Sequence, residues 1–298
     1  MPEDVSIREG VCPMQCLIQE LRIADRNCRL YLPPDYEKGE ARYPVIYVNG
    51  DIPVEGIVTK LVNEGARADF FLLSIQPEDW NDDFTPWAAP AFRAGEKAPR
   101  GRADDYLSCL TEKIKPYMDA HYRTKPDPAH TALLGYSLGG LTAVYAVYKT
   151  DVFGVIASLS GSLWFDGFCG FMEREKPLRT DLRIYLSLGK RESRSKNPRM
   201  SRVAECTQRA REILAGQLQW TDESGDDGDR ADREGGESRQ KTGIESKGQV
   251  CFEWNEGGHF HDIEGRFAKA LMYLLTLQIG DTVEIVYNGD ILESYPAQ

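Results

Sequence analysis

The chain has 298 residues, of which 41% are hydrophobic and 28% are charged, a composition typical of a soluble globular protein with a substantial core. Its formal net charge of -11 argues against a nucleic-acid partner and against an anionic membrane surface. No apolar run approaches the roughly 20 residues of a membrane-spanning helix. The acidic start, MPEDVSIREG, does not have the composition of a signal peptide.

The seven cysteines are scattered along the chain and odd in number, which favours reduced thiols over a disulfide framework. We therefore expect a cytoplasmic protein. Cys12 and Cys16 have no matching second pair of cysteines, so we predict no metal site there.

The first part of the chain alternates between strand-like and helical segments. CLIQELRI and CRLYLPP are strand-like and are separated by the turn ADRN, which predicts a β-hairpin. YPVIYVNGD and FFLLSIQP are compact apolar runs suited to buried strands, and residues 54–67 between them have helical length. Residues 102–122 carry apolar side chains at helical spacing, which predicts an amphipathic helix.

The alternation continues toward the C-terminus. Strands are predicted for the segments TALLGY, GVIASLSG, RIYLSLG and VCFEW. Helices are predicted for residues 139–149, 166–176, 199–219 and 263–278. Repeated strand-then-helix order implies an α/β fold with a mostly parallel central sheet and helices on both faces.

One α/β domain accounts for residues 1–278. Within it, residues 222–247 are polar, glycine-rich and almost free of large apolar side chains, so we predict a flexible acidic insertion. Residues 279–298 contain Asn288-Gly289 between alternating runs, which predicts a C-terminal β-hairpin appended to the domain. The edge strands of such a hairpin could pair with a second copy, so a homo-oligomer is one expectation.

The segment GYSLG places Ser137 between a predicted strand and a predicted helix. It fits the pattern G-x-S-x-G, in which small flanking residues let the strand and the helix pass close together at a strained turn. A serine held this way is exposed above the edge of the sheet. Ser137 is therefore our candidate nucleophile.

A serine nucleophile needs a base, and the base needs a carboxylate to hold it. In sheets that carry such a turn, the base follows the last strand, and His259 does so in NEGGHFHD. His261 is the rival base, or it could bind a metal with His259 and Asp262, but we prefer a role at the surface or in support of the site. The acid should follow a strand between the serine and the histidine, which indicates Glu192; a surface charge is the alternative reading.

Acyl transfer also needs N–H donors for the negative oxygen that develops in the transition state. We expect one donor to be the backbone N–H of Leu138, at the start of the helix after the serine. The second should come from the loop NGD after the strand YPVIYV, at Asp51 or Ile52.

Aromatic residues gather in loops at the same predicted edge of the sheet. Trp87, Tyr136 and Trp164 are candidate substrate-binding residues, because aromatic side chains in loops that follow strands often line pockets. Packing in the core is the alternative for each of them.

The order of these motifs is similar to that of a known family. YLPPDY, YPVIYVNGD, DDFTPW, LLGYSLGGL, SLSGSLW, SLGKRE and NEGGHF follow one another between about residues 28 and 278. The chain thereby resembles the esterase D-like, or enterochelin esterase-like, family of the α/β-hydrolase superfamily. The resemblance implies a carboxylic ester hydrolase with no cofactor, with Ser137 as nucleophile, His259 as base and Glu192 at the position of the acid. The acidic insertion and the C-terminal hairpin depart from the family pattern.

We therefore expect a serine esterase that forms an acyl-enzyme and acts on a small-molecule ester. A siderophore lactone and a small acyl or feruloyl ester are both compatible with an aromatic pocket. The alternatives are a non-catalytic binding protein on a hydrolase scaffold, and an acyltransferase or peptidase that uses the same three residues.

Overall fold

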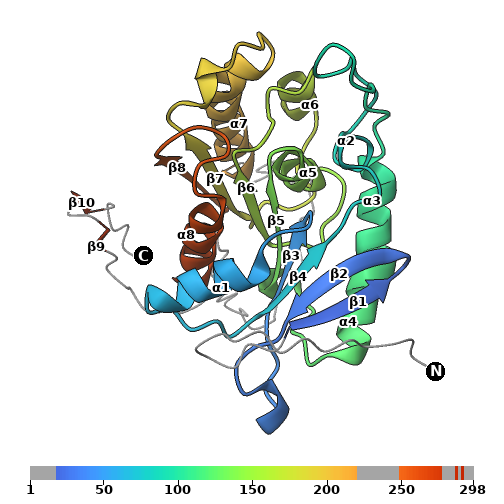
Figure 1. Ribbon diagram of the computed structural model, residues 1–298, viewed down its shortest axis with the longest axis vertical. Coiled ribbons are helices and arrows are strands. Elements are labelled where there is room, and N and C mark those ends of the chain that lie inside the picture. Colours follow the sequence, from blue (N-terminus) through green and yellow to red (C-terminus); the bar gives the residue numbers. More distant parts are fainter. Residues whose placement is uncertain (1–17, 220–247, 277–285, 288–289, 292–298) are drawn as a thin grey trace, which may run out of the picture.

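The computed structural model describes residues 18–219, 248–276, 286–287 and 290–291 (Figure 1). Its strands are β1 (Ile18–Ile23), β2 (Arg26–Tyr31), β3 (Val45–Asn49), β4 (Phe71–Ile75), β5 (Thr131–Tyr136), β6 (Val155–Leu159), β7 (Arg183–Gly189), β8 (Gln249–Asn255), β9 (Val286–Tyr287) and β10 (Asp290–Ile291). Its helices are α1 (Val54–Asn63), α2 (Trp80–Asp83), α3 (Ala103–Cys109), α4 (Lys115–His121), α5 (Leu138–Ala146), α6 (Phe168–Arg174), α7 (Val203–Leu218) and α8 (Ile263–Thr276).

Strands β1 to β8 form one sheet in the order β1-β2-β4-β3-β5-β6-β7-β8. The hairpin of β1 and β2 is antiparallel and pairs antiparallel with β4, whereas β4, β3 and β5 to β8 all run parallel. The carboxyl ends of β5, β7 and β8 therefore lie at one edge of the sheet. That edge is where the loops carrying the predicted site residues begin.

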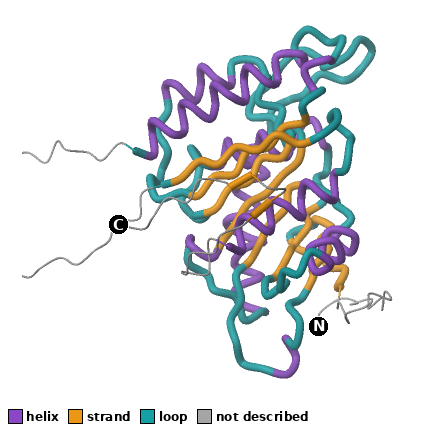
Figure 2. The backbone as a smooth tube through the Cα atoms, turned by 90° about the vertical axis from the view of Figure 1, so that its left-hand side faces the viewer, coloured by secondary structure: helices purple, strands orange, loops and turns teal. Residues whose placement is uncertain are grey.

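Helices cover both faces of the sheet (Figure 2). On one face, α1 and α8 pack against each other and against side chains such as Ile46 and Val48 of β3. On the other face, the remaining long helices pack against the alternate side chains of the same strand, Val45 and Tyr47. The inner parallel strands β3 to β6 are buried on both sides, and their sequences are mostly apolar, as expected for such a sheet.

The predicted α/β class, with a mostly parallel sheet and helices on both faces, is confirmed. The expected helix over 102–122 is α3 and α4 joined by a π-helical turn at Leu110–Ile114. The expected helix over 199–219 begins as α-helix only at Val203, after Pro198 and a short 3-10 turn at Met200–Arg202. The helix expected over 54–67 ends at Asn63.

Of the two chain segments predicted to depart from the core, the structure describes only part of the C-terminal one. Residues 222–247 lie outside the described residues. In the C-terminal segment, β9 and β10 pair antiparallel, with Val286 opposite Ile291. The division into a domain at 1–278 and an appendage at 279–298 stays a prediction, as does a homo-oligomer. None of the helices in the described parts of the chain is long and apolar enough to cross a bilayer.

Candidate active site

Ser137 occupies the turn between β5 and α5, with φ 57° and ψ -120°. This left-handed conformation is costly for a residue other than glycine, and it exposes the side chain at the end of the strand. The neighbours must be small: a Cβ on Gly135 would lie 2.1 Å from the carbonyl oxygen of Gly139, and a Cβ on Gly139 would lie 2.8 Å from that of Asn49. The glycines of the G-x-S-x-G pattern therefore permit the close approach of β5, α5 and β3.

Three predicted residues meet at this edge of the sheet. The Oγ atom of Ser137 lies 3.1 Å from Nε2 of His259, and Nδ1 of His259 lies 2.7 Å from Oε2 of Glu192. His259 belongs to the loop between β8 and α8, and Glu192 belongs to the loop after β7. With Glu192 ionised, Nδ1 carries the ring proton and Nε2 is free to accept the proton of Ser137.

Glu192 is buried and fully hydrogen-bonded. Its second oxygen, Oε1, accepts bonds from Ser160 Oγ at 2.7 Å, from the Gly189 N–H at 2.8 Å and from Arg266 Nη1 at 2.8 Å. Burial by itself raises the pKa of the Glu192 carboxyl, but the hydrogen bonds from His259, Ser160 and Gly189 outweigh it and hold the pKa below its ordinary value. The carboxylate is therefore ionised at neutral pH.

Arg266 is a residue of this site that the motifs did not reveal. It is only 2% exposed, and besides Glu192 it bonds the carbonyl oxygens of Glu256 at 3.2 Å and Gly258 at 2.8 Å. One guanidinium thus ties the carboxylate to the loop that carries His259. A signal was present in the sequence, because Arg266 stands one helical turn before Ala270 on the apolar face of α8. A cation on such a face is buried and needs a buried carboxylate as its partner.

The backbone N–H groups expected to bind the negative oxygen have different hydrogen-bond partners. Leu138 is the first residue of α5, where the backbone N–H has no acceptor within the helix, and it lines the cleft beside Ser137. The N–H of Ile52, in contrast, donates to Ser74 Oγ at 3.2 Å. Asp51 is exposed, and neither residue is among those that line the cleft. We therefore correct the expectation for Ile52, whose N–H is already committed to Ser74.

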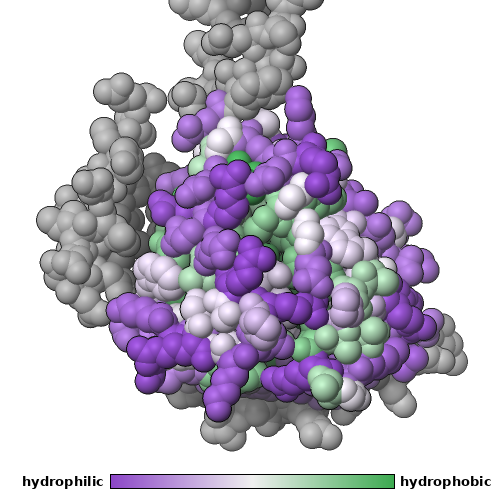
Figure 3. Space-filling model, turned by 90° about the horizontal axis from the view of Figure 1, so that it is seen from above, coloured by the Kyte–Doolittle hydropathy of each residue, from purple (hydrophilic) through white to green (hydrophobic). Residues whose placement is uncertain are grey.

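Ser137 opens into a cleft of about 350 Å³. Figure 3 looks down on the end of the molecule toward which the parallel strands point, and shows apolar surface between hydrophilic side chains. Of the three predicted aromatic residues, Trp164 lines the cleft. The other aromatic residues that line it are Trp80, Phe92 and Phe260, of which Trp80 is 39% and Phe260 80% exposed.

Trp87 and Tyr136 lie elsewhere, and we correct the prediction that they line the substrate pocket. The ring of Trp87 packs against Phe165 and Phe171, and its Nε1 donates to the carbonyl oxygen of Asp166 at 2.9 Å. Tyr136 is buried, and its hydroxyl donates to the carbonyl oxygen of His259 and accepts a bond from Arg266 at 3.1 Å. Both side chains therefore support the site from the core.

His261, the rival base, is exposed and its ring lies against Gly257. The ring that reaches Ser137 is that of His259. Within residues 18–219 and 248–276, no three or more His, Cys, Asp or Glu side chains are grouped as metal ligands.

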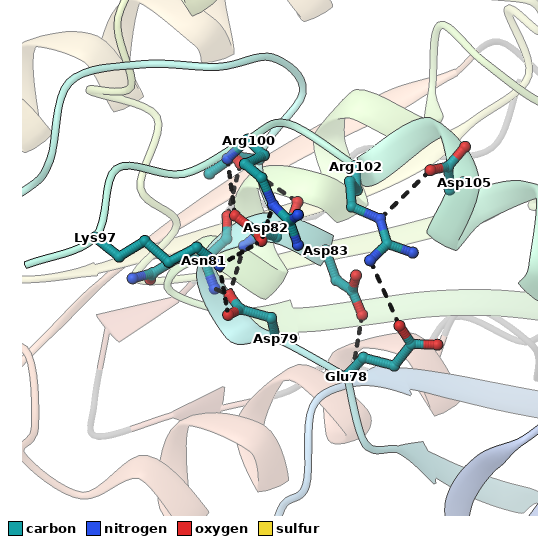
Figure 4. Close-up of polar contacts among 10 residues, drawn as sticks. Glu78, Asp79, Asn81, Asp82, Asp83, Lys97, Arg100, Arg102 and Asp105 are labelled. Atoms are coloured by element: carbon teal, nitrogen blue, oxygen red, sulfur yellow. Dashed lines mark hydrogen bonds and ion pairs between the residues drawn. The ribbon is translucent and has the colours of Figure 1, made fainter.

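A network of carboxylates holds the rim of the cleft at α2, the short helix that carries Trp80 (Figure 4). Asp79 caps this helix by accepting the N–H groups of Asn81 and Asp82. Asp82 is buried and accepts bonds from the Arg100 N–H at 2.8 Å, from Arg100 Nε at 2.6 Å and from Lys97 Nζ at 2.9 Å. Burial raises the pKa of Asp82, but these hydrogen bonds outweigh it and lower the pKa to about 2.

We expect Asp82→Asn to lower the thermal midpoint of unfolding at neutral pH by several degrees, for a loss of about 1–3 kcal/mol. The pKa of Asp82 is about 2 in the folded protein, against about 3.9 for an unfolded chain. The ionised Asp82 therefore stabilises the fold fully when the pH is above its pKa in the unfolded chain. This stabilisation is lost as the pH falls through its pKa in the folded protein. The difference between wild type and variant should shrink between about pH 4 and pH 2.

Melting curves by circular dichroism across this pH range measure the effect. Asp105→Asn is the matched control, because the Asp105 side chain is 73% exposed and pairs only at 3.5 Å with Arg102. A variant at Asp82 that melts like wild type at neutral pH would show that the network does not stabilise the rim.

The chain is similar to known proteins over most of its length. Residues 23–240 match the family Esterase, described as "Putative esterase". The Bacillus subtilis (strain 168) protein YbbA, named as uncharacterized, is 26% identical over 206 residues, which make up 67% of this chain and 82% of that protein.

Two solved structures are similar in fold. An IroE-like serine hydrolase from Shewanella oneidensis has a TM-score of 0.65 at 15% identity, covering 92% of this chain and 80% of that one. The enterobactin esterase FES from Shigella flexneri has a TM-score of 0.59 at 16% identity, covering 93% of this chain and 60% of that one.

Proposed function

Because the chain belongs to the esterase family that matches its residues 23–240, we propose that this esterase cleaves carboxylic esters with a serine nucleophile and an acyl-enzyme intermediate. The family match confirms the resemblance found in the sequence motifs. The observation that carries the serine mechanism is the hydrogen-bonded series from Ser137 through His259 to Glu192.

In this mechanism, Ser137 Oγ attacks the ester carbonyl while Nε2 of His259 takes the serine proton. The Leu138 N–H donates to the negative oxygen of the tetrahedral intermediate. His259 then gives the proton to the leaving alcohol, and Glu192 stabilises the imidazolium without itself becoming protonated. Water, deprotonated by His259, releases the acid and restores the serine.

A siderophore lactone is one candidate substrate, and a small acyl or feruloyl ester is the other. Trp80, Phe92 and Trp164 line the cleft and provide aromatic surface for either. The lactone is favoured by the similarity in fold to the enterobactin esterase FES. An acyltransferase or peptidase would use the same three residues. The presence of Ser137, His259 and Glu192 together argues against a non-catalytic scaffold.

A fluorophosphonate probe tests the serine mechanism, because it phosphonylates a hydroxyl only when a neighbouring base activates it. We expect one adduct per chain, located by peptide mass spectrometry on Ser137. Protein that is denatured before labelling should give no adduct. Hydrolysis of p-nitrophenyl butyrate without an adduct on Ser137 would overturn the proposal.

A further inference from the structure

Part of the wall of the cleft is assembled from three separate chain segments. Phe92 comes from the loop after α2, Trp164 from the loop after β6, and Met200 from the turn before α7. The rings of Phe92 and Trp164 meet edge to face, with centroids 5.5 Å apart and planes at 82°. We call these three side chains, Phe92, Trp164 and Met200, the aromatic wall, after its two rings.

Arg199 contacts all three segments of the aromatic wall. Its Nε and Nη2 atoms lie 3.1 and 2.6 Å from the two carboxylate oxygens of Asp166, just after Trp164. Its Nη1 donates to the carbonyl oxygens of Pro90 and Ala91, both at 3.1 Å, just before Phe92. The guanidinium carbon lies 5.5 Å from the ring centre of Phe92 and 5.7 Å from that of Trp164.

Asn197 holds Arg199 in this position. Its side-chain amide donates to the carbonyl oxygen of Phe92 at 2.7 Å, and its Oδ1 accepts the backbone N–H of Arg199 at 2.9 Å. The turn that presents the guanidinium is thus bonded directly to the aromatic wall.

These contacts are poorly suited to stabilising the whole fold. The ion pair is partly exposed, since the Arg199 and Asp166 side chains are 24% and 44% exposed, so water weakens its contribution to the stability of the whole fold. The bidentate pair and the two bonds to carbonyl oxygens instead hold the neighbouring chain segments in fixed relative positions, because a planar guanidinium orients its acceptors.

We propose that Arg199 is a positioning residue that determines specificity: it holds the aromatic wall in place, and the wall binds the bulky apolar part of the ester. This inference rests on the proposed function of Ser137. It assigns to Arg199 no role in the chemical step, so the residue should affect binding of large esters and leave small ones unchanged.

Kinetics with two esters test the proposal. Vinyl acetate is small on both sides of the ester bond, and p-nitrophenyl phenylacetate carries a ring on each side. For Arg199→Ala we expect KM for p-nitrophenyl phenylacetate to rise about tenfold with kcat within about twofold, and kcat/KM for vinyl acetate to stay within about twofold. Arg199→Lys, which keeps the charge without the planar fork, should give an intermediate KM.

Arg202→Ala is the matched control, because Arg202 is a nearby exposed arginine that pairs at 3.1 Å with Glu205. It should leave both esters unchanged. An equal loss for both esters in Arg199→Ala, or no change for either, would overturn the inference.

A binding measurement separates this inference from the serine mechanism. In a Ser137→Ala background, the amide N-(4-nitrophenyl)phenylacetamide is titrated against tryptophan fluorescence. Arg199→Ala should weaken its binding about tenfold. Equal affinity with and without Arg199 would overturn the inference, whatever the role of Ser137.

Discussion

Ser137→Ala is expected to lower kcat for p-nitrophenyl acetate and butyrate by at least about 10³-fold, because no other hydroxyl in the described parts of the chain can form the acyl-enzyme through His259. Among the described residues, the substitution removes the only hydroxyl that both lines the cleft and hydrogen-bonds His259 Nε2, at 3.1 Å. Alanine is smaller than serine and keeps the turn, so the protein should remain folded by circular dichroism.

Ser162→Ala is the control for this variant. Its hydroxyl also lines the cleft and lies 3.3 Å from Ser137 Oγ, but it makes no contact with His259 that would activate it. We expect this variant to retain activity within about tenfold of wild type. Turnover that survives in folded Ser137→Ala, or that disappears only in Ser162→Ala, would mean that another residue is the nucleophile.

Glu192→Gln is expected to lower kcat by about 10³- to 10⁴-fold, although it changes a single atom. The reason lies in the donors around Oε1, which are Ser160, Gly189 and Arg266. The oxygen of the glutamine must face these donors, so its NH₂ group faces His259 Nδ1. A donor at that position forces the proton of the ring onto Nε2, and His259 can no longer accept the proton of Ser137.

The measurement is kcat for p-nitrophenyl butyrate, together with a melting curve that verifies folding. Glu256→Gln is the matched control, because the Glu256 carboxylate is 75% exposed, pairs with Lys190 and lies in the same loop as His259. It should leave kcat within about twofold of wild type. Near-normal turnover in Glu192→Gln would show that Glu192 does not hold His259, and that the enzyme works with a serine–histidine pair.

The sequence was sufficient for the fold because its signals are local. Apolar runs of strand length alternate with amphipathic segments, and that order alone implies a parallel sheet covered on both faces. The glycines around Ser137 predict its place in a tight turn, because they are needed where β5 and α5 approach each other closely. His259 and Glu192 followed from the rule that such residues come after strands.

What the sequence could not supply are contacts between distant segments. Whether Trp87 or Phe92 faces the cleft depends on how the loop after α2 packs on α6, which no local pattern encodes. The sequence presents the Ile52 N–H as a donor for the site, but this group donates to Ser74 on the adjacent strand β4. Arg199 joins three segments, so its importance appears only in three dimensions, and for Arg266 the sequence indicated a buried position but not its partners. The cytoplasmic location stays a prediction.

The pairing of β7 with β8 has a consequence for how this chain can evolve. Gly189 stands opposite Asn255, and Arg266 bonds the carbonyls of Glu256 and Gly258, so the place of His259 is fixed from both sides of its loop. Among the described residues, each of these contacts is made outside residues 219–248. We therefore expect insertions and deletions between Leu218 and Gln249 to leave the distance from His259 to Ser137 unchanged, since lengthening a loop costs little entropy.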